Sequence, residues 1–218
     1  LFIEYQGTMY AGFQFQAGQP TIQRELEKAV ARFTGREPRI RGASRTDSGA
    51  HAQGQVVDFM TAAEHPPEQF LRGLNFYLPA DIVIQEAYEV NPEFHSRRSA
   101  LTRIYRYHIL NQSQPSPIRR NTHHLVRGTL DAAQMAGAVR GLVGEHDFRP
   151  LAAGHPKEKS AVRRVSRWEV WRDGDTVIIE CEANGFLRHQ IRRANALLVG
   201  VGTGKWTESI ITDSLQAR

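Results

Sequence analysis

The sequence contains one cysteine and no long hydrophobic run. Cys181 is the only cysteine among 218 residues, so the chain cannot form an internal disulfide framework, and a cysteine-rich zinc site is excluded. It lies in the apolar stretch TVIIECEA, which predicts a small core residue rather than a nucleophile and agrees with a reducing, cytoplasmic setting. The chain has no run of about eighteen apolar residues and no signal-peptide pattern, so we expect neither membrane insertion nor export.

Sequence patterns for nucleotide hydrolysis and metal binding are also absent. The segment VGVGTGKWTES invites comparison with a phosphate-binding loop, but that motif needs Gly five positions before Gly204, where this chain has Val199. The motif also needs Ser or Thr after Lys205, where the chain has Trp206. The nine histidines show no recurrent ligand spacing, and a nucleophile elbow for Ser-His-Asp chemistry is missing. We therefore expect neither nucleotide hydrolysis nor a metal centre.

Lysine is scarce, because 24 of the 28 basic residues are arginine. The first hundred residues carry 10 basic and 12 acidic side chains, whereas the rest carry 18 basic and 11 acidic ones. The net charge is therefore −2 in the first part and +7 in the second. Arginine binds phosphate through a planar fork and stacks on bases, so this pattern favours a nucleic-acid partner, although a GC-rich gene alone also enriches arginine.

Hydrophobic periodicity predicts two α+β lobes. In the first half we expect strands at 1–5, 54–60 and 81–90 and helices at 21–33 and 66–78. In the second half we expect a strand at 101–110, a hairpin at 163–183 that turns at Asp173-Gly174, and helices at 131–144 and 185–202. The boundary near FHSRRSA gives an N-terminal domain at 1–98 and a basic C-terminal domain at 99–218. Because both ends fall inside predicted elements, we expect a longer natural chain.

Arginines line one side of the last predicted helix. Its apolar residues recur at spacings of four and three, at Leu187, Ile191, Ala194, Leu198 and Val201. Arg188 and Arg192 are four residues apart on the flank of this stripe, where cations can reach across a cleft. A solvated basic face is the alternative interpretation. We expect Arg188 and Arg193 to contact phosphates of a nucleic acid.

The strand LTRIYRYHIL interleaves aromatic and basic residues. Alternation puts one set on the same face, Arg103, Tyr105 and Tyr107, and the other set on the opposite face, Ile104, Arg106 and His108. Such a pattern is typical of a base-stacking platform with backbone clamps. An ordinary half-exposed strand explains it equally well, because tyrosine is a strong strand former.

The stretch GASRTDSGAHAQGQVVDF places an aspartate in a tight turn that runs directly into a strand. Asp47 lies between Arg45 and Gly49. A turn aspartate commonly accepts a hydrogen bond from its own backbone two residues on, so turn capping is the simplest interpretation. A catalytic carboxylate is the alternative.

Five motifs in order resemble one known family. RTDSGAHA followed by GQVVDF closely resembles the GRTDxGVHA signature of the tRNA pseudouridine(38–40) synthase family. The stretches YQGTMYAGFQFQ with TIQRELEKA, FHSRRSA, RIYRYHI and NGFLRHQIRRANALLVGVGTGK fall in the order of that family. The resemblance covers nearly the whole chain.

The resemblance implies a role for each of several residues. Asp47 matches the catalytic aspartate of the family, and Tyr105 matches its active-site tyrosine. Arg192 matches the basic residue that pairs with the aspartate, and Arg45 matches the arginine next to the flipped nucleotide. Ser44 replaces the usual glycine of the motif without removing a catalytic group.

The resemblance also implies a fold, a reaction and partners. The fold is two ferredoxin-like lobes forming one continuous mixed or antiparallel sheet, with helices on one face and the active-site cleft between the lobes. The reaction isomerises uridine to pseudouridine at positions 38–40 in the anticodon stem-loop of tRNA, without a cofactor. The partners are tRNA and a second copy of the chain in a homodimer, with no membrane.

Two other functions fit parts of the sequence. A non-catalytic tRNA-binding or chaperone module needs the basic second half but not Asp47, and the set of Asp47, Tyr105 and Arg192 argues against it. A pseudouridine synthase acting at another RNA site keeps the chemistry and changes the substrate.

Overall fold

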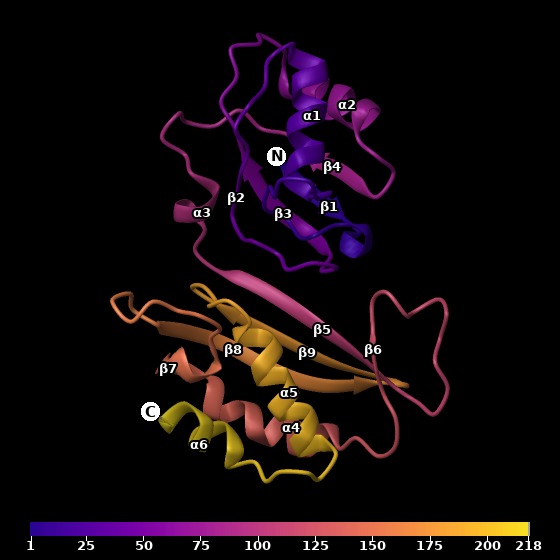
Figure 1. Cartoon of the computed structure of the whole chain (residues 1–218), viewed down its shortest axis with the longest axis vertical. Coiled ribbons are helices and arrows are strands. Elements are labelled where there is room, and N and C mark those ends of the chain that lie inside the picture. The colour runs from indigo at the N-terminus through magenta and orange to yellow at the C-terminus, as the bar shows by residue number, and fades with distance from the viewer. Residues whose placement is uncertain (218) are drawn as a thin grey trace. The chain divides into compact units, whose positions relative to one another are not determined.

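The computed structural model describes residues 1–217, which divide into two compact units, Leu1–Ala100 and a second unit that begins at Leu101 (Figure 1). Each unit has its own sheet and its own hydrophobic core. The expected α+β class with mixed and antiparallel sheets is confirmed. The resemblance implies one continuous sheet, whereas the described strand pairings give one sheet in each unit.

The first unit has the element order of a ferredoxin-like domain. Its elements are β1 (Phe2–Tyr5), the 3₁₀ helix η1 (Gly7–Met9), α1 (Ile22–Thr34), β2 (Arg41–Gly42), β3 (Ala52–Asp58), α2 (Pro67–Tyr77), β4 (Ile82–Glu86) and α3 (Ser96–Ser99). The strands lie in the order β2-β3-β1-β4, and every neighbouring pair is antiparallel. This is the β-α-β-β-α-β arrangement in which two helices join strands that are not neighbours.

Local sequence signals explain both ends of α1. The Thr21 hydroxyl accepts a hydrogen bond from the Arg24 amide at 3.3 Å and caps the first turn. Gly35 ends the helix in the left-handed conformation with φ of 73°. Between them a stripe of apolar side chains packs into the core of the unit, as the periodicity predicts; its buried members are Ile22, Leu26, Ala29 and Val30.

The edge strand β4 is clamped by a side chain from α2. The Asn75 side-chain amide donates to Ile84 O at 2.9 Å, and the Ile84 amide donates to Asn75 Oδ1 at 2.7 Å. These bonds occupy backbone groups that an edge strand otherwise leaves open to another chain. The strand ends at Glu86 rather than at residue 90 as predicted, and Tyr88 and Val90 beyond it are exposed. These two side chains therefore do not pack into the core of the unit.

The second unit follows the first five elements of this order and carries a short strand at each edge of its sheet. Its elements are β5 (Arg103–Asn111), β6 (His124–Val126), α4 (Ala132–Ala138), η2 (Val139–Leu142), β7 (Gly144–Asp147), η3 (Arg149–Leu151), β8 (Val162–Asp173), β9 (Thr176–Ala183), α5 (Gln190–Gly202) and α6 (Ile210–Gln216). The five that follow the order are β5, α4, β8, β9 and α5. The strand order is β6-β5-β9-β8-β7, with β6 parallel to β5 and the other pairs antiparallel. The short strands β6 and β7 carry too few residues to show a period, so the sequence did not predict them.

Strand alternation places Cys181 inside the second unit. Val177, Ile179, Cys181 and Ala183 of β9 all face the core. Cys181 is 1% exposed, and burial raises the pKa of its thiol to about 12. The predicted core role is confirmed, because a thiol held in its protonated form at neutral pH is a poor nucleophile.

Three predicted boundaries in the second unit are wrong. The helix expected at 131–144 is α-helical only to Ala138, continues as η2, and gives way to β7 at Gly144. The hairpin turns at Gly174-Asp175, because the strands extend to Asp173 and resume at Thr176. Gly174 has a φ of 57°, which a glycine adopts without strain.

The third wrong boundary is the start of α5, expected at residue 185 and observed at Gln190. His189, with φ of 61°, is the one non-glycine residue of positive φ in the described chain, and it prevents the helix from extending backward. The Gln190 side chain instead accepts a hydrogen bond from the Leu187 amide at 2.8 Å. Arg188 therefore lies before the helix and not one turn from Arg192.

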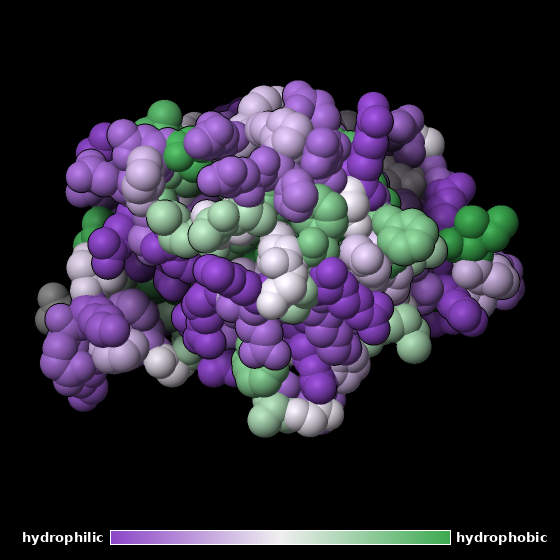
Figure 2. All heavy atoms as spheres, turned by 90° about the horizontal axis from the view of Figure 1, so that it is seen from above, coloured by the Kyte–Doolittle hydropathy of each residue, from purple (hydrophilic) through white to green (hydrophobic). Residues whose placement is uncertain are grey.

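Within residues 1–217, no helix has the length and apolar character needed to cross a bilayer. Figure 2 shows a face on which hydrophilic residues predominate and hydrophobic ones form small groups. Hydrophobic groups of this size are ordinary on protein surfaces.

An ion pair between Arg41 and the buried Asp58 anchors the strands on either side of the Asp47 loop. Asp58, at the end of β3 and 8% exposed, accepts hydrogen bonds from the Arg41 guanidinium, at 2.7 Å from Nε, and from the Ser96 amide at 2.9 Å. The Ser96 hydroxyl donates to Arg41 O at 3.3 Å, so α3 is tied to β2 as well. Burial raises the pKa of Asp58, but the hydrogen bonds from Ser96 and Arg41 outweigh it and hold the pKa below its usual value.

We predict that Asp58→Ala lowers the free energy of unfolding by about 2–3 kcal/mol, because it leaves the Ser96 amide and the Arg41 guanidinium without their acceptor. The wild-type contribution is present at neutral pH and is lost as the pH falls through the lowered folded pKa, so the difference between the two proteins should shrink in acid. Urea unfolding of both proteins at pH 7 and pH 3 measures this. Lys28→Ala, at the exposed pair with Glu25, is the control and should change stability by less than about 0.5 kcal/mol.

Candidate active site

The predicted aspartate lies in an exposed turn between two strands of the first unit. Residues 43–51 connect β2 to β3, and within them the Ala50 amide donates to Asp47 O at 3.1 Å. Gly49 has a φ of 77°, which closes the turn. Arg45 and Asp47 are both exposed. The predicted tight turn is confirmed, and the aspartate side chain is accessible to a substrate.

A second segment, residues 7–13, holds the backbone of this turn. The Phe13 amide donates to Thr46 O at 3.1 Å, on one side of Asp47. On the other side, the Gly49 amide and the Ser48 hydroxyl both donate to Tyr10 O at 3.2 Å. The turn is therefore fixed on both sides of the aspartate.

Two buried tyrosines connect the turn and its supporting segment to the rest of the unit, because Tyr5 of β1 bonds to the turn and Tyr10 of the segment bonds to Asp81. The hydroxyls of Tyr5 and Thr46 lie 2.8 Å apart in a hydrogen bond. The buried Tyr10 donates from its hydroxyl to Asp81 at 2.6 Å, and burial together with this carboxylate raises the pKa of Tyr10. The hydrogen bond to Asp81 holds the side chain of the residue whose carbonyl supports the turn.

Two glycines allow the close approach. A Cβ atom on Gly7 would lie 1.9 Å from Ala50 O, and one on Gly12 would lie 2.7 Å from Thr46 O. Gly12 also has a φ of 100°, in the region that favours glycine. Sequence reasoning did not assign these residues to the site, although the glycines of YQGTMYAGF were the available signal.

In the second unit, aromatic residues gather at the start of β5. Tyr105 and Tyr107 share one face of the strand as predicted, and the structure shows that this is the core side, because they pair with the inward-facing Cys181 and Ile179 of β9. The Tyr105 ring meets the edge of the Phe186 ring, with centroids 5.3 Å apart at 90°. Phe186 belongs to the motif NGFLRHQIRRANALLVGVGTGK, but no sequence pattern assigned it a role in the site.

Arg192 lies near this aromatic group. Burial raises the pKa of the Tyr107 hydroxyl, and the positive charge of Arg192 opposes that effect, so the two side chains are close enough to interact. Arg192 is exposed in the first turn of α5. The second unit thus brings together a half-buried Tyr105, its neighbour Phe186 and an exposed arginine.

The other predicted arginines have mixed outcomes. Arg193 donates to Ala152 O at 2.6 Å, and Arg188 is exposed, with its carbonyl accepting from the Ala153 amide at 2.9 Å. On β5, Arg103 donates to Asn184 O at 2.7 Å, and Arg106 pairs with the buried Glu180 at 2.6 Å. The two strand arginines therefore serve the sheet, and the ordinary-strand interpretation fits them better than backbone clamps.

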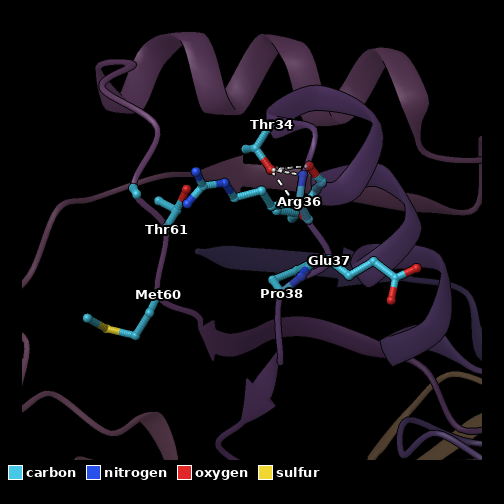
Figure 3. A pocket seen from close by; sticks show the side chains of 8 residues that line it. Thr34, Arg36, Glu37, Pro38, Met60 and Thr61 are labelled. Carbon is cyan, nitrogen blue, oxygen red and sulfur yellow. Dashed lines mark hydrogen bonds between the residues drawn. The ribbon is translucent and has the colours of Figure 1, made fainter.

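A cavity lies elsewhere in the first unit. It has a volume of about 320 Å³, and its lining includes Thr34, Arg36, Met60 and Thr61. Figure 3 shows the Arg36 side chain extending toward Thr61, with Glu37 pointing away from it. None of the predicted site residues lines this cavity.

The sequence matches a known protein family over most of its length. The family model described as tRNA pseudouridine synthase matches residues 1–97 and 138–218. The two matched regions include the Asp47 turn with its supporting segment and the whole of α5 with Phe186 before it.

Similar curated proteins carry the name tRNA pseudouridine synthase A. One from Geobacter sp. (strain M21) is 40% identical over 205 residues, which covers 94% of this chain and 83% of that protein. One from Roseiflexus castenholzii is 43% identical over 208 residues, covering 93% and 76%, and one from Ruminiclostridium cellulolyticum is 42% identical over 212 residues, covering 97% and 86%. The chain therefore belongs to the tRNA pseudouridine synthase family.

Proposed function

We propose that this chain isomerises uridine to pseudouridine in the anticodon stem-loop of tRNA, at positions 38–40. The observation that carries the proposal is the Asp47 turn. Its aspartate is exposed, and residues 7–13 form hydrogen bonds to the turn on both sides of this aspartate. Membership of the tRNA pseudouridine synthase family supports the same reaction. Because hydrogen bonds hold the backbone of the turn, its exposed carboxylate can meet a substrate atom in a fixed position.

The reaction breaks the bond from C1′ to N1, rotates the base, and joins C1′ to C5, with loss of the C5 proton and gain of a proton at N1. One carboxylate is enough for this isomerisation, since nothing is oxidised and no group leaves the molecule. Asp47 acts either as a nucleophile toward the ribose or the ring, or as the base that starts glycosidic cleavage.

The target base has to leave its stack before Asp47 can reach it, which costs a few kcal/mol. Tyr105 offsets part of this cost by stacking on the flipped base, and it assists loss of the C5 proton. Phe186 supports this role, because its edge contact restricts the plane in which the Tyr105 ring can lie. Arg45, two residues before Asp47, fills or braces the space that the base vacates.

Arg192 is the proposed counter-ion of Asp47 in the RNA complex. A carboxylate enclosed by substrate loses its water, and a neighbouring positive charge keeps it ionised. The exposed position of Arg192 in the first turn of α5 supports this role, since its side chain is accessible. Arg188 and Arg193 contribute positive charge for tRNA phosphates.

We also propose a cytoplasmic homodimer that binds tRNA. The single cysteine is buried, and a chain without a disulfide framework suits a reducing compartment. Light scattering of the purified chain with and without tRNA measures the number of subunits in the complex.

We predict that Asp47→Asn reduces pseudouridine formation at least about a hundredfold while tRNA affinity stays within about threefold, because the amide keeps the shape and loses the reactive carboxylate. A mass-shift assay after chemical derivatisation of pseudouridine measures the rate, and filter binding measures affinity. Activity within tenfold of wild type would return Asp47 to the turn-capping interpretation.

We predict that Tyr105→Phe keeps base stacking and slows the chemical step. Tyr105→Leu should also lose the stacking, which is worth about 1–3 kcal/mol. Single-turnover kinetics with varied enzyme concentration separate binding from chemistry. Circular dichroism of both variants controls for folding, because Tyr105 packs against the core of the second unit. Wild-type kinetics in both variants would remove Tyr105 from the site.

For Arg192 we predict that Met moves the acid limb of the pH–rate profile upward by about one pH unit or more, because a desolvated carboxylate without a positive neighbour is harder to ionise. Arg192→Lys keeps the positive charge but loses the planar guanidinium group, so it should shift the acid limb less. Arg140→Met, at an exposed cation on η2, is the control and should leave the limb in place. An unshifted limb and a near-normal rate in Arg192→Met would contradict the pairing with Asp47.

A further inference from the structure

The loop between η3 and β8 lies against the start of α5. The Ala153 amide donates to Arg188 O at 2.9 Å, and the Arg193 guanidinium donates to Ala152 O at 2.6 Å. Both contacts join the loop to residues that flank Arg192 in the sequence. The loop is therefore fixed beside the arginine that we assign to the reaction.

Side chains brace this loop internally, so its backbone has a defined shape. Arg149 donates to Pro156 O at 3.2 Å and to Lys159 O at 3.1 Å, and the Lys159 amide donates to Pro156 O at 3.2 Å. His155 Nε2 lies 3.2 Å from Lys159 O. Lys157 and Lys159 thus project as exposed cations from a loop that is already ordered.

Arg163 adds a cation that is partly withdrawn from water. Its Nη1 donates to Ser160 O at 3.1 Å and to Val162 O at 2.7 Å, and its side chain passes beside Gly185. Burial lowers the pKa of Arg163, and no carboxylate pairs with it among residues 1–217. A half-buried guanidinium that has only carbonyl partners is stabilised further by an arriving anion.

These basic residues come from η3 and the loop before β8, from the start of β8 and from the start of α5, which the contacts above join. We call this group the basic collar, and its members are Arg149, Lys157, Lys159, Arg163, Arg188 and Arg193. The carboxylates close to it in the sequence are Asp147, whose oxygen lies 3.9 Å from Arg149, and the exposed Glu158. The collar therefore keeps a strong excess of positive charge.

We propose that the basic collar binds the sugar–phosphate backbone of the RNA substrate beside the nucleotide that Tyr105 receives. This inference rests on the proposed function. The Arg163 side chain lies beside Gly185, and the next residue, Phe186, contacts Tyr105, so the collar comes close to the residue that receives the base. Neither described cavity, of about 320 and 190 Å³, includes a collar residue. Exposed cations spread over a loop suit an extended polyanion better than a small enclosed phosphate.

The test neutralises the two projecting lysines together, in the double variant Lys157→Gln and Lys159→Gln. The matched control removes the same charge elsewhere, in the double variant Arg120→Gln and Arg140→Gln, at exposed cations of the same unit. Binding of each full chain to unmodified tRNA is measured between about 50 and 200 mM salt.

The collar variant should bind about tenfold more weakly at low salt, and its slope of log affinity against log salt should flatten by about 1.5 units, because each lost phosphate contact contributes about 0.7–0.9. The control should keep the wild-type slope and an affinity within twofold. An unchanged slope in the collar variant, or equal flattening in the control, would overturn the proposal.

Pseudouridine formation in the same samples distinguishes this inference from the proposed function. At saturating enzyme the collar variant should react at the wild-type single-turnover rate, since both lysines act on binding and not on the reacting atoms. If the wild type forms pseudouridine and the slopes of wild type and collar variant agree, the collar assignment alone fails. If the wild type binds tRNA without forming pseudouridine, the proposed function fails. The slopes of log affinity against log salt then still show whether the basic collar binds RNA.

Discussion

The backbone contact between residues 7–13 and the Asp47 turn is the constraint on which the candidate site depends. Thr46 O and Ala50 O, on either side of the aspartate, approach Gly12 and Gly7 so closely that a Cβ atom has no room. Hydrogen bonds from Phe13 N and to Tyr10 O then fix the turn. Because every one of these atoms except the Ser48 hydroxyl belongs to the backbone, neighbouring side chains can vary without moving the turn.

The supporting segment in turn takes its position from the core of the first unit. It connects β1 to α1, and its Tyr10 is buried and bonded to Asp81 at the start of β4. The Arg41–Asp58–Ser96 cluster closes the other end, where β2 and β3 carry the turn. An exposed loop thereby acquires the rigidity of the sheet, which functional loops on stable scaffolds require.

The second unit divides its arginines between structure and surface. Arg106 and Arg167 both bind Glu180, which is 7% exposed and would be costly to bury without them. Their charges count toward the excess of +7, yet they are committed to the sheet. The charge left for RNA gathers at the loop before β8 and at the start of α5, so its position matters more than the total.

The start of α5 shows that the spacing of apolar residues does not determine where a helix begins. Apolar residues at helical spacing extend back to Leu187, and the period alone continues the helix to residue 185. The helix begins only at Gln190, because His189 adopts the left-handed conformation and the Gln190 side chain accepts a hydrogen bond from the Leu187 amide. Neither feature produces a periodic pattern in the sequence. Arg188 consequently joins the loop contact with Ala153, while Arg192 stays on the helix near Tyr107.

The sequence by itself determined the α+β class, the main strands and helices, the buried role of Cys181 and the tight turn at Asp47. These depend on alternation, helical spacing and glycine positions, all of which act over a few neighbouring residues. Only the tertiary structure decided which glycines support the turn, that Phe186 meets Tyr105, and that the loop before β8 lies against α5. Each of these contacts joins segments far apart in the chain, and its strength comes from close packing and hydrogen bonding between surfaces that no local pattern records.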